Sequence, residues 1–227
     1  MITKKIKLVI FDVDGTILDT ERPYVESCMK VLKDWGYHDI TREPFYRCMG
    51  LNKVAYEEKM QKILGSEFPF RAFRTKAHEE EDIYYQSHPL KKMPGVDETF
   101  AFLKENSIPM AIATSRYREK SDHNLAKVGL LDSYDFSICG DEIINSKPDP
   151  EIFLKAAKHF NTDPSEAVVI EDSSNGLKAA INGGFRCILV PHVAILSDDD
   201  KAKAFRVVKK LDDIVDVICE VNGLCRK

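Results

Sequence analysis

The hydrophobic pattern of the chain consists of short, continuous apolar runs separated by amphipathic stretches. Continuous runs, unlike alternating ones, are typical of strands that are covered on both faces, as in a parallel sheet. These runs lie at Ile6–Phe11, Met110–Thr114, Phe136–Gly140, Ala167–Glu171 and Cys187–Val190. Helical spacing of apolar residues fills the intervals at Val96–Asn106, Arg118–Val128, Pro150–Phe160 and Asn175–Asn182. The alternation predicts an α/β fold with a doubly wound parallel sheet.

One long segment, from about Thr20 to about Pro89, breaks this alternation because it contains no strand pattern. Its apolar spacing predicts helices at Pro23–Trp35, Lys53–Leu64 and Arg71–Tyr85. We therefore expect a small all-helical domain, residues 19–90, inserted into an α/β core made of residues 1–18 and 91–227. The many aromatic residues of the insertion favour a bundle core over a ligand site.

Shorter segments complete the predicted organisation. Hinges are expected at Leu18–Thr20 and Ser87–Met93, and they would allow the helical insertion to act as a lid. Near the C-terminus, Phe205–Leu211 fits an edge strand and Asp212–Val221 fits a closing helix with its first residue as N-cap. The acidic run Asp198–Asp200 is typical of a solvated loop.

Composition places the chain among ordinary soluble globular proteins. It has 227 residues, of which 44% are hydrophobic and 31% are charged, and a formal net charge of −4. This mild acidic excess lacks the basic footprint of nucleic-acid or anionic-membrane binding, so we expect neither partner. No apolar run approaches the roughly 20 residues that span a bilayer, and the N-terminus lacks the pattern of a secretory signal. The chain has six scattered cysteines and no C-x-x-C pair. The cysteine pattern and the missing secretory signal together predict a cytoplasmic protein with free thiols.

Polar side chains follow four of the predicted strands. In an open α/β sheet, ligands bind beyond the carboxyl ends of the strands, so these positions are candidate site residues. They are Asp12-Val13-Asp14-Gly15-Thr16, Thr114-Ser115-Arg116, Ser146-Lys147 and Glu171-Asp172-Ser173. Taken singly, each motif is typical of a turn or a helix start. At one edge of a sheet, together they have the composition of a metal-and-phosphate site.

The chemistry of these residues favours a magnesium ion and a phosphate group. Asp12 and Asp14 lie two residues apart and would repel each other, which a hard divalent cation relieves. Asp172 and Glu171, which follow another strand, can complete the acidic site. Lys147 supplies a positive charge, and the hydroxyl and backbone N–H after the second strand offer hydrogen bonds to phosphate oxygens.

Four motifs, in this order, resemble those of the haloacid dehalogenase superfamily of phosphatases. They are D-V-D-G-T at Asp12–Thr16, the hydroxyl of Thr114, Lys147 within S-K-P-D-P, and E-D-S at Glu171–Ser173. The resemblance covers essentially the whole chain, and the helical insertion resembles the cap of the β-phosphoglucomutase-like branch. The carboxyl group of Asp14 is similar to that of the superfamily's phosphatases and phosphomutases, whereas its C–Cl-cleaving members use a different first motif.

The resemblance implies a role for each matching residue. Asp12 would be the nucleophile that forms an aspartyl-phosphate, and Asp14 would act as general acid and then as general base. Thr114, the backbone N–H of Ser115 and Lys147 would hold the phosphoryl oxygens. The magnesium ligands that it implies are Asp12, Asp14 through its backbone carbonyl, Asp172, and Glu171 through water or as a supporting group.

Several positions of the chain depart from the β-phosphoglucomutase pattern. Tyr24 matches that enzyme's cap histidine, Lys53 matches its phosphate-binding arginine, and Arg116-Tyr117-Arg118 replaces a small polar run. These departures favour a phosphatase and leave a phosphomutase as the alternative. A non-catalytic phosphate-binding protein is less expected, because the residues that such a protein would lose are all present.

The substrate predicted from the resemblance is a small phosphorylated metabolite, such as a sugar phosphate, that a lid can enclose. The candidate substrate-binding residues are Ser115, Arg116, Asn52, Lys53 and Lys76. The six histidines show no metal-ligand spacing, so no role is assigned to them. We expect a monomer or a weak dimer.

Overall fold

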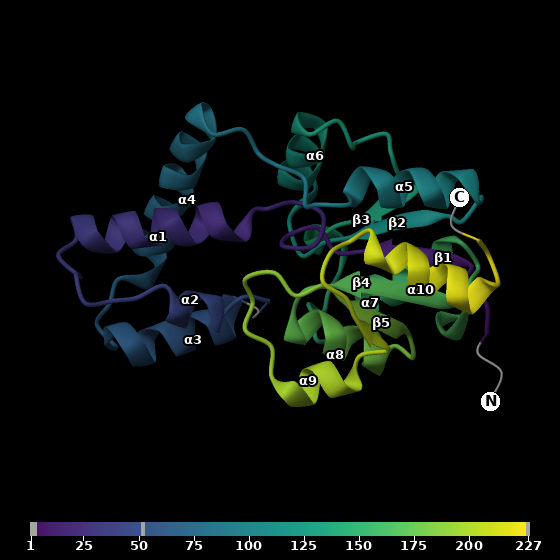
Figure 1. Cartoon of the computed structure of the whole chain (residues 1–227). Helices are drawn as coiled ribbons and strands as arrows, with labels where there is room; N and C mark the ends of the chain where they lie inside the picture. The colour runs from purple at the N-terminus through teal and green to yellow at the C-terminus, as the bar shows by residue number, and fades with distance from the viewer. Residues whose placement is uncertain (1–3, 51–52, 226–227) are drawn as a thin grey trace.

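A six-stranded parallel sheet forms the centre of the α/β part of the chain (Figure 1). The computed structural model describes residues 4–50 and 53–225. The strands are β1 (Leu8–Phe11), β2 (Met110–Ala113), β3 (Phe136–Ile138), β4 (Ala167–Glu171), β5 (Arg186–Leu189) and β6 (Arg206–Val207), in the order β3-β2-β1-β4-β5-β6. Every pairing between neighbouring strands is parallel. The predicted doubly wound α/β fold is therefore confirmed.

Helices cover both faces of the sheet (Figure 1). One face packs against α5 (Val96–Glu105), α6 (Arg118–Lys127) and α10 (Asp213–Asn222), and the other against α7 (Glu151–His159) and α8 (Ser174–Asn182). Alternate residues of one strand serve the two layers, because side chains along a strand point to opposite faces. In β1, Val9 and Phe11 join the first apolar cluster, and Leu8 and Ile10 join the second. This double burial explains the continuous apolar runs in the sequence.

The predicted helical insertion after β1 is confirmed. It contains α1 (Glu21–Asp34), α2 (Glu43–Tyr46), α3 (Lys53–Leu64) and α4 (Phe70–Ser87), which lie beyond one end of the sheet (Figure 1). The described residues of these helices and their loops form an apolar cluster of their own, rich in aromatic rings. This separate cluster supports the predicted domain division at residues 18/19 and 90/91, which stays a prediction. We refer to the insertion as the cap.

The two chain crossings between core and cap lie side by side. An antiparallel bridge joins Leu18 to Lys92. Asp19 N donates to Lys91 O at 3.0 Å, and Met93 N donates to Ile17 O at 2.7 Å. Two adjacent, hydrogen-bonded crossings are a suitable place for a hinge, in agreement with the predicted positions; the hinge motion itself stays a prediction.

Two details differ from the sequence-based expectation. The acidic run Asp198–Asp200 begins helix α9 (Asp198–Lys203), so the solvated-loop prediction was wrong. Ser197 caps this helix by accepting from Asp200 N at 3.0 Å, and acidic residues in a first turn are stabilised by the helix dipole. The predicted edge strand near residue 205 is reduced to the two residues of β6, while α10 follows as expected with Asp212 at its N-cap position.

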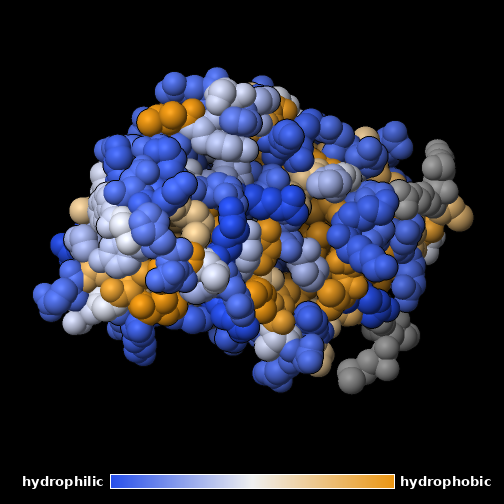
Figure 2. Space-filling model, turned by 60° about the vertical axis from the view of Figure 1, so that its left-hand side comes forward, coloured by the Kyte–Doolittle hydropathy of each residue, from blue (hydrophilic) through white to orange (hydrophobic). Residues whose placement is uncertain are grey.

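The surface carries hydrophobic residues in patches among hydrophilic ones on the face that Figure 2 shows. Within the described ranges, helices long and apolar enough to cross a membrane are absent.

We predict that Phe73→Ala destabilises the cap. Phe73 is fully buried, and its ring centroid lies 5.2 Å from that of Phe68 and 6.1 Å from that of Trp35. Truncating such a ring leaves a cavity and costs about 3–5 kcal/mol. Guanidinium unfolding, followed by the fluorescence of Trp35, the chain's one tryptophan, measures the loss. The matched control is Ile83→Ala on the same helix, where the side chain is 51% exposed. A loss for Phe73→Ala no larger than for this control contradicts the assignment of a cap core.

Candidate active site

The carboxyl ends of β1, β2 and β4, together with the segment between β3 and α7 that carries Lys147, bring the predicted site residues to one edge of the sheet. Because β1 lies between β2 and β4, residues that follow these three strands meet there. A cavity of about 720 Å³ is lined by residues of this edge and of the cap. The predicted residues that line it are Asp12, Asp14, Ser115, Arg116, Lys147, Glu171 and Asp172. Residues far apart in the sequence thus form one site.

Lys147 is the central cation of this site. Its Nζ donates to Asp12 Oδ1 at 2.5 Å, to Glu171 Oε1 at 2.7 Å and to the Ala113 carbonyl at 3.2 Å. Burial alone would lower the pKa of Lys147, but the carboxylates of Asp12 and Glu171 outweigh burial and raise it. The lysine is therefore held in its charged form, with one hydrogen bond directed at the predicted nucleophile.

Asp12 lies at the end of β1 and is almost completely buried. Burial raises the pKa of Asp12 to about 7, against the opposing effect of Lys147. Ligand oxygens of Asp12, Glu171 and Asp172 lie within 4.8 Å of one another. Carboxylates at this spacing can share a divalent cation, which would relieve the repulsion between them.

Glu171 is fixed by a set of hydrogen bonds. Its Oε2 accepts from the backbone N–H of Asp172 at 3.1 Å, and from the N–H and hydroxyl of Ser173 at 3.0 and 2.9 Å. Gly176 in α8 has no side chain at the point where a Cβ would collide with this carboxylate. Because Glu171 is so fully engaged, its geometry supports the predicted supporting role beside the metal ligands.

Asp14 is held by one residue of the core and one of the hinge. Arg116 Nε donates to its two carboxylate oxygens at 2.6 and 2.7 Å, and Thr20 Oγ1 donates to Oδ1 at 2.6 Å. Burial would lower the pKa of Arg116, but the carboxylates of Asp14 and of Glu81, on α4, outweigh it. The sequence predicted Arg116 as a substrate contact. The structure pairs it with Asp14, and the contact with substrate stays a prediction.

A further carboxylate at this edge, that of Glu21, is buried against the carboxylate of Asp172. Within the described residues, Glu21 Oε2 and Asp172 Oδ2 have no hydrogen-bond partner. Burial, together with the nearby Asp14 carboxylate, raises the pKa of Glu21 to about 8, and burial together with Glu21 raises the pKa of Asp172. Carboxylate oxygens only accept hydrogen bonds, so the pair needs a cation or a proton. A donor set made of carboxylate oxygens fits magnesium better than it fits zinc or copper.

Two of the predicted phosphate-binding residues, Thr114 and Ser115, lie at the turn after β2, and among the described residues Ser115 lines the cavity whereas Thr114 does not. Thr114 is fully buried, and its Oγ1 accepts from Arg116 N at 3.1 Å, which fixes this turn. Ser115 follows and lines the cavity. At Gly140 a Cβ would collide with the carbonyl oxygen of Ser115, so glycine permits close approach of the two segments. The position of Ser115 is compatible with its predicted contact to phosphate.

On the cap side, the structure adds residues that the sequence did not single out for this site. Tyr24, Tyr56, Arg74 and His78 line the cavity, as does Glu21. Of the residues predicted here, Lys76 lies on the exposed side of α4, where its Nζ pairs with Glu79 at 2.9 Å, and it is not part of the cavity lining among the described residues. Asn52 and the side chain of Lys53 lie outside the described residues, so their predicted contacts stay predictions.

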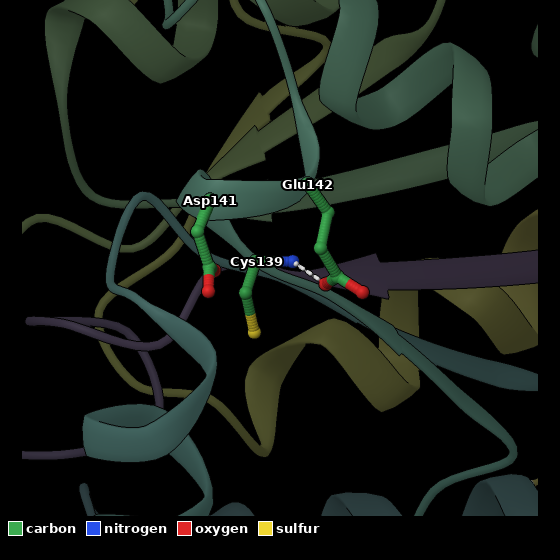
Figure 3. A group of neighbouring side chains, drawn as sticks. All are labelled: Cys139, Asp141 and Glu142. Atoms are coloured by element: carbon green, nitrogen blue, oxygen red, sulfur yellow. Dashed lines mark hydrogen bonds between the residues drawn. The ribbon is translucent and has the colours of Figure 1, made fainter.

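A second acidic group lies after β3 and does not have the properties of a metal site. Figure 3 shows Asp141 and Glu142 on the 3₁₀ turn Gly140–Glu142 and Cys139 at its N-cap position, with the backbone N–H of Cys139 donating to Glu142 at 2.7 Å. Arg118 occupies the carboxylates: its Nη2 donates to Glu142 at 2.5 Å and its backbone N–H to Asp141 at 2.9 Å. Burial raises the pKa of Cys139 to about 11, so the thiol stays protonated, whereas metals bind the thiolate. These interactions stabilise the turn.

Comparison with known proteins places this site in a family. The family model for haloacid dehalogenase-like hydrolases matches residues 9–190. The chain is 34% identical over 180 residues to a phosphorylated carbohydrates phosphatase of Thermotoga maritima, covering 79% of this chain and 82% of that protein. It is 30% identical over 220 residues to a probable pseudouridine-5'-phosphatase of Drosophila melanogaster, covering 93% of each.

Solved structures agree with these sequence matches. A Thermotoga maritima protein provisionally named beta-phosphoglucomutase superimposes with a TM-score of 0.74 at 32% identity, covering 95% of this chain and 100% of that chain. The matched family region includes all four motifs at the sheet edge, from Asp12 to Asp172. The chain therefore belongs to the haloacid dehalogenase-like hydrolase family.

Proposed function

We propose that this chain is a magnesium-dependent phosphatase that hydrolyses a small phosphorylated metabolite through an aspartyl-phosphate on Asp12. The observation that carries the proposal is the buried ion pair between Asp12 and Lys147, which lies among further carboxylates at an edge that faces a cavity. The family and the similarity to a named phosphatase support the same chemistry.

Magnesium is the cofactor that the donor set fits. It would be held by Asp12, the backbone carbonyl of Asp14 and Asp172, with Glu171 as a supporting group. When bound, the ion would offset the negative charge of the carboxylates and of the phosphoryl group. Lys147 would add a second positive charge to the same oxygens.

The chain's own residues supply both half-reactions. In the first, the Asp12 carboxylate attacks phosphorus, the bond from phosphorus to the leaving oxygen breaks, and that oxygen takes a proton from Asp14. In the second, Asp14 takes a proton from a water molecule as the water attacks phosphorus, which releases inorganic phosphate and restores the Asp12 carboxylate. General acid–base help of this kind is worth about 10²–10⁴-fold in rate. Positioning and charge neutralisation supply the remainder.

A phosphomutase is the second candidate, favoured by the similarity to the protein provisionally named beta-phosphoglucomutase. Both activities would use Asp12 and Asp14, so they differ only in the acceptor of the phosphoryl group. Tyr24 lines the cavity at the position where the resemblance implies a cap histidine in the mutase, which favours the phosphatase.

We predict that Asp12→Asn lowers the rate of magnesium-dependent phosphate release from p-nitrophenyl phosphate by at least about 10³-fold. The amide is a poor nucleophile, while Lys147 keeps its ion pair with Glu171, so the unfolding midpoint should shift by less than about 4 °C. Asp141→Asn is the matched control, because this exposed carboxylate follows β3, another strand of the same sheet, and does not line the cavity. Turnover that survives in Asp12→Asn removes Asp12 from its proposed role.

The phosphatase and the mutase are distinguished by their products. With β-glucose 1-phosphate as substrate, we expect free phosphate to appear faster than glucose 6-phosphate. A coupled assay for glucose 6-phosphate, run beside a phosphate assay on the same sample, measures both rates. Faster formation of glucose 6-phosphate overturns the phosphatase proposal in favour of the mutase.

Arg74 should contribute to substrate binding. Arg74 is half-buried and lines the cavity from α4. Among the described residues it forms no ion pair. Lys120, which also lines the cavity, differs in this respect, because it pairs with Asp82 at 2.7 Å. We predict that Arg74→Gln raises KM for the best substrate of a sugar, nucleotide and amino-acid phosphate panel by about 10-fold, the cost of a charge-assisted hydrogen bond, and changes kcat less than about 2-fold. Arg71→Gln, exposed on the same helix, is the matched control. An unchanged KM for Arg74→Gln contradicts this role.

A further inference from the structure

Glu21 is a buried carboxylate that the proposed chemistry does not use. It is the first residue of α1, where the chain enters the cap, and only 8% of it is exposed. It lines the cavity together with Asp12 and Asp172. Its Oε2 is buried and has no hydrogen-bond partner among the described residues. Removing a carboxylate from water costs free energy, and a buried carboxylate normally has a hydrogen-bond or charge partner that offsets this cost.

The Glu21 side chain is directed at the proposed metal site. A Cβ added at Gly15 would lie 2.8 Å from Glu21 Oε2 and would also collide with Asp172 Oδ2. Both unpartnered oxygens therefore approach the same point beside the backbone of Gly15. The φ angle of Gly15 is 78°, a conformation that glycine adopts readily, and the missing side chain leaves room for the two carboxylates.

Lys147 and Arg116, the two cations that form ion pairs with carboxylates of this site among the described residues, are engaged elsewhere. Lys147 pairs with Asp12 and Glu171, and Arg116 pairs with Asp14. In the part of the chain that the structure describes, neither Glu21 nor Asp172 has an ion pair. Two facing carboxylates in a buried place repel each other unless a cation lies between them or one is neutralised. The geometry therefore leaves a place for one more positive charge, next to the carboxylates proposed as metal ligands.

We propose that Glu21 belongs to the same cation site as Asp12 and Asp172 and supports the bound ion through a water molecule, because its carboxylate lies outside the group of oxygens that are close enough to share one ion directly. Because Glu21 is the first residue of α1, a bound ion would link the start of this cap helix to the carboxyl end of β4. Metal binding and cap position are coupled by this one side chain. The inference rests on the proposed function, since it extends the magnesium site on which that function depends.

Calorimetric titration of Mg²⁺ into the metal-free, full-length protein tests this coupling. For Glu21→Gln we expect Mg²⁺ affinity to fall about 10–100-fold, the range typical for loss of a group that supports a metal site. We also expect the metal-free variant to unfold at a higher temperature than the metal-free wild type, because the amide is not ionisable and so avoids the cost of burying a carboxylate beside Asp172. The variant should also gain less from saturating Mg²⁺. The matched control is Glu26→Gln on the same helix, which removes the same charge from an exposed pair with Arg42 and should bind Mg²⁺ as the wild type does.

A measurement on the wild type keeps the proposal testable if Glu21→Gln does not fold. Hydrogen exchange of the backbone amides of residues 19–25 should slow when Mg²⁺ is added, while the amides of α3 should not respond. Two results would overturn the role of Glu21 and leave the phosphatase proposal standing. One is equal Mg²⁺ affinity in the wild type and Glu21→Gln, and the other is a hydrogen-exchange rate at residues 19–25 that Mg²⁺ does not change. Failure of the wild type to bind Mg²⁺ at all overturns both.

Discussion

An excess of buried negative charge at one edge of the sheet is the constraint on which the site depends. Five carboxylates gather there, and they are Asp12, Asp14, Glu21, Glu171 and Asp172. In the described part of the chain, three of them are in ion pairs, formed by Lys147 and Arg116. Removing an ion from water costs several kcal/mol unless it is paired and hydrogen-bonded. Among the residues that the structure describes, these pairs leave Glu21 and Asp172 facing each other without a cation. The repulsion among these buried carboxylates is unfavourable by itself, and a bound divalent ion would offset it.

The fold supports this arrangement by separating the site from the parts that stabilise the chain. Two apolar layers cover the sheet, and a third apolar cluster fills the cap, so the strand ends are free to carry polar groups. Glycine at two positions provides the close approach that the carboxylates need. Gly15 leaves space for Glu21 and Asp172, and Gly176 leaves space for Glu171. Stability from burial thus offsets the cost of a site prepared for its ligand.

Much of the site could be predicted because it follows from strand ends. Asp12, Asp14, Glu171 and Asp172 come at or directly after short apolar runs, and a parallel sheet brings such positions to one edge. The cap side could not be predicted in this way. Whether Arg74 or Lys76 faces the cavity depends on how α4 is rotated against α1, and apolar spacing fixes that only through packing in the finished bundle. Lys76 was therefore proposed from a resemblance, whereas its neighbour Arg74 lines the cavity.

Glu21 illustrates a different limit of sequence reasoning. An acidic residue in the first turn of a helix is ordinary, because the helix dipole favours it there. The available signal was its place directly after the predicted hinge at Leu18–Thr20, which brings the start of the cap back to the end of β1. The acidic run at Asp198–Asp200 shows the opposite error, since charge alone indicated a loop where Ser197 caps a helix. Local composition does not report what a side chain faces in the folded chain.

The central claim is that one cation is bound between the carboxylates of Asp12 and Asp172, beside Lys147. Anomalous diffraction from crystals grown with Mn²⁺ in place of Mg²⁺ locates such an ion directly. The account predicts a single strong peak at this edge, within bonding distance of oxygens from both aspartates and with the Lys147 ammonium still at Asp12. A peak elsewhere, or carboxylates of Asp12 and Asp172 that share no ion, would contradict it.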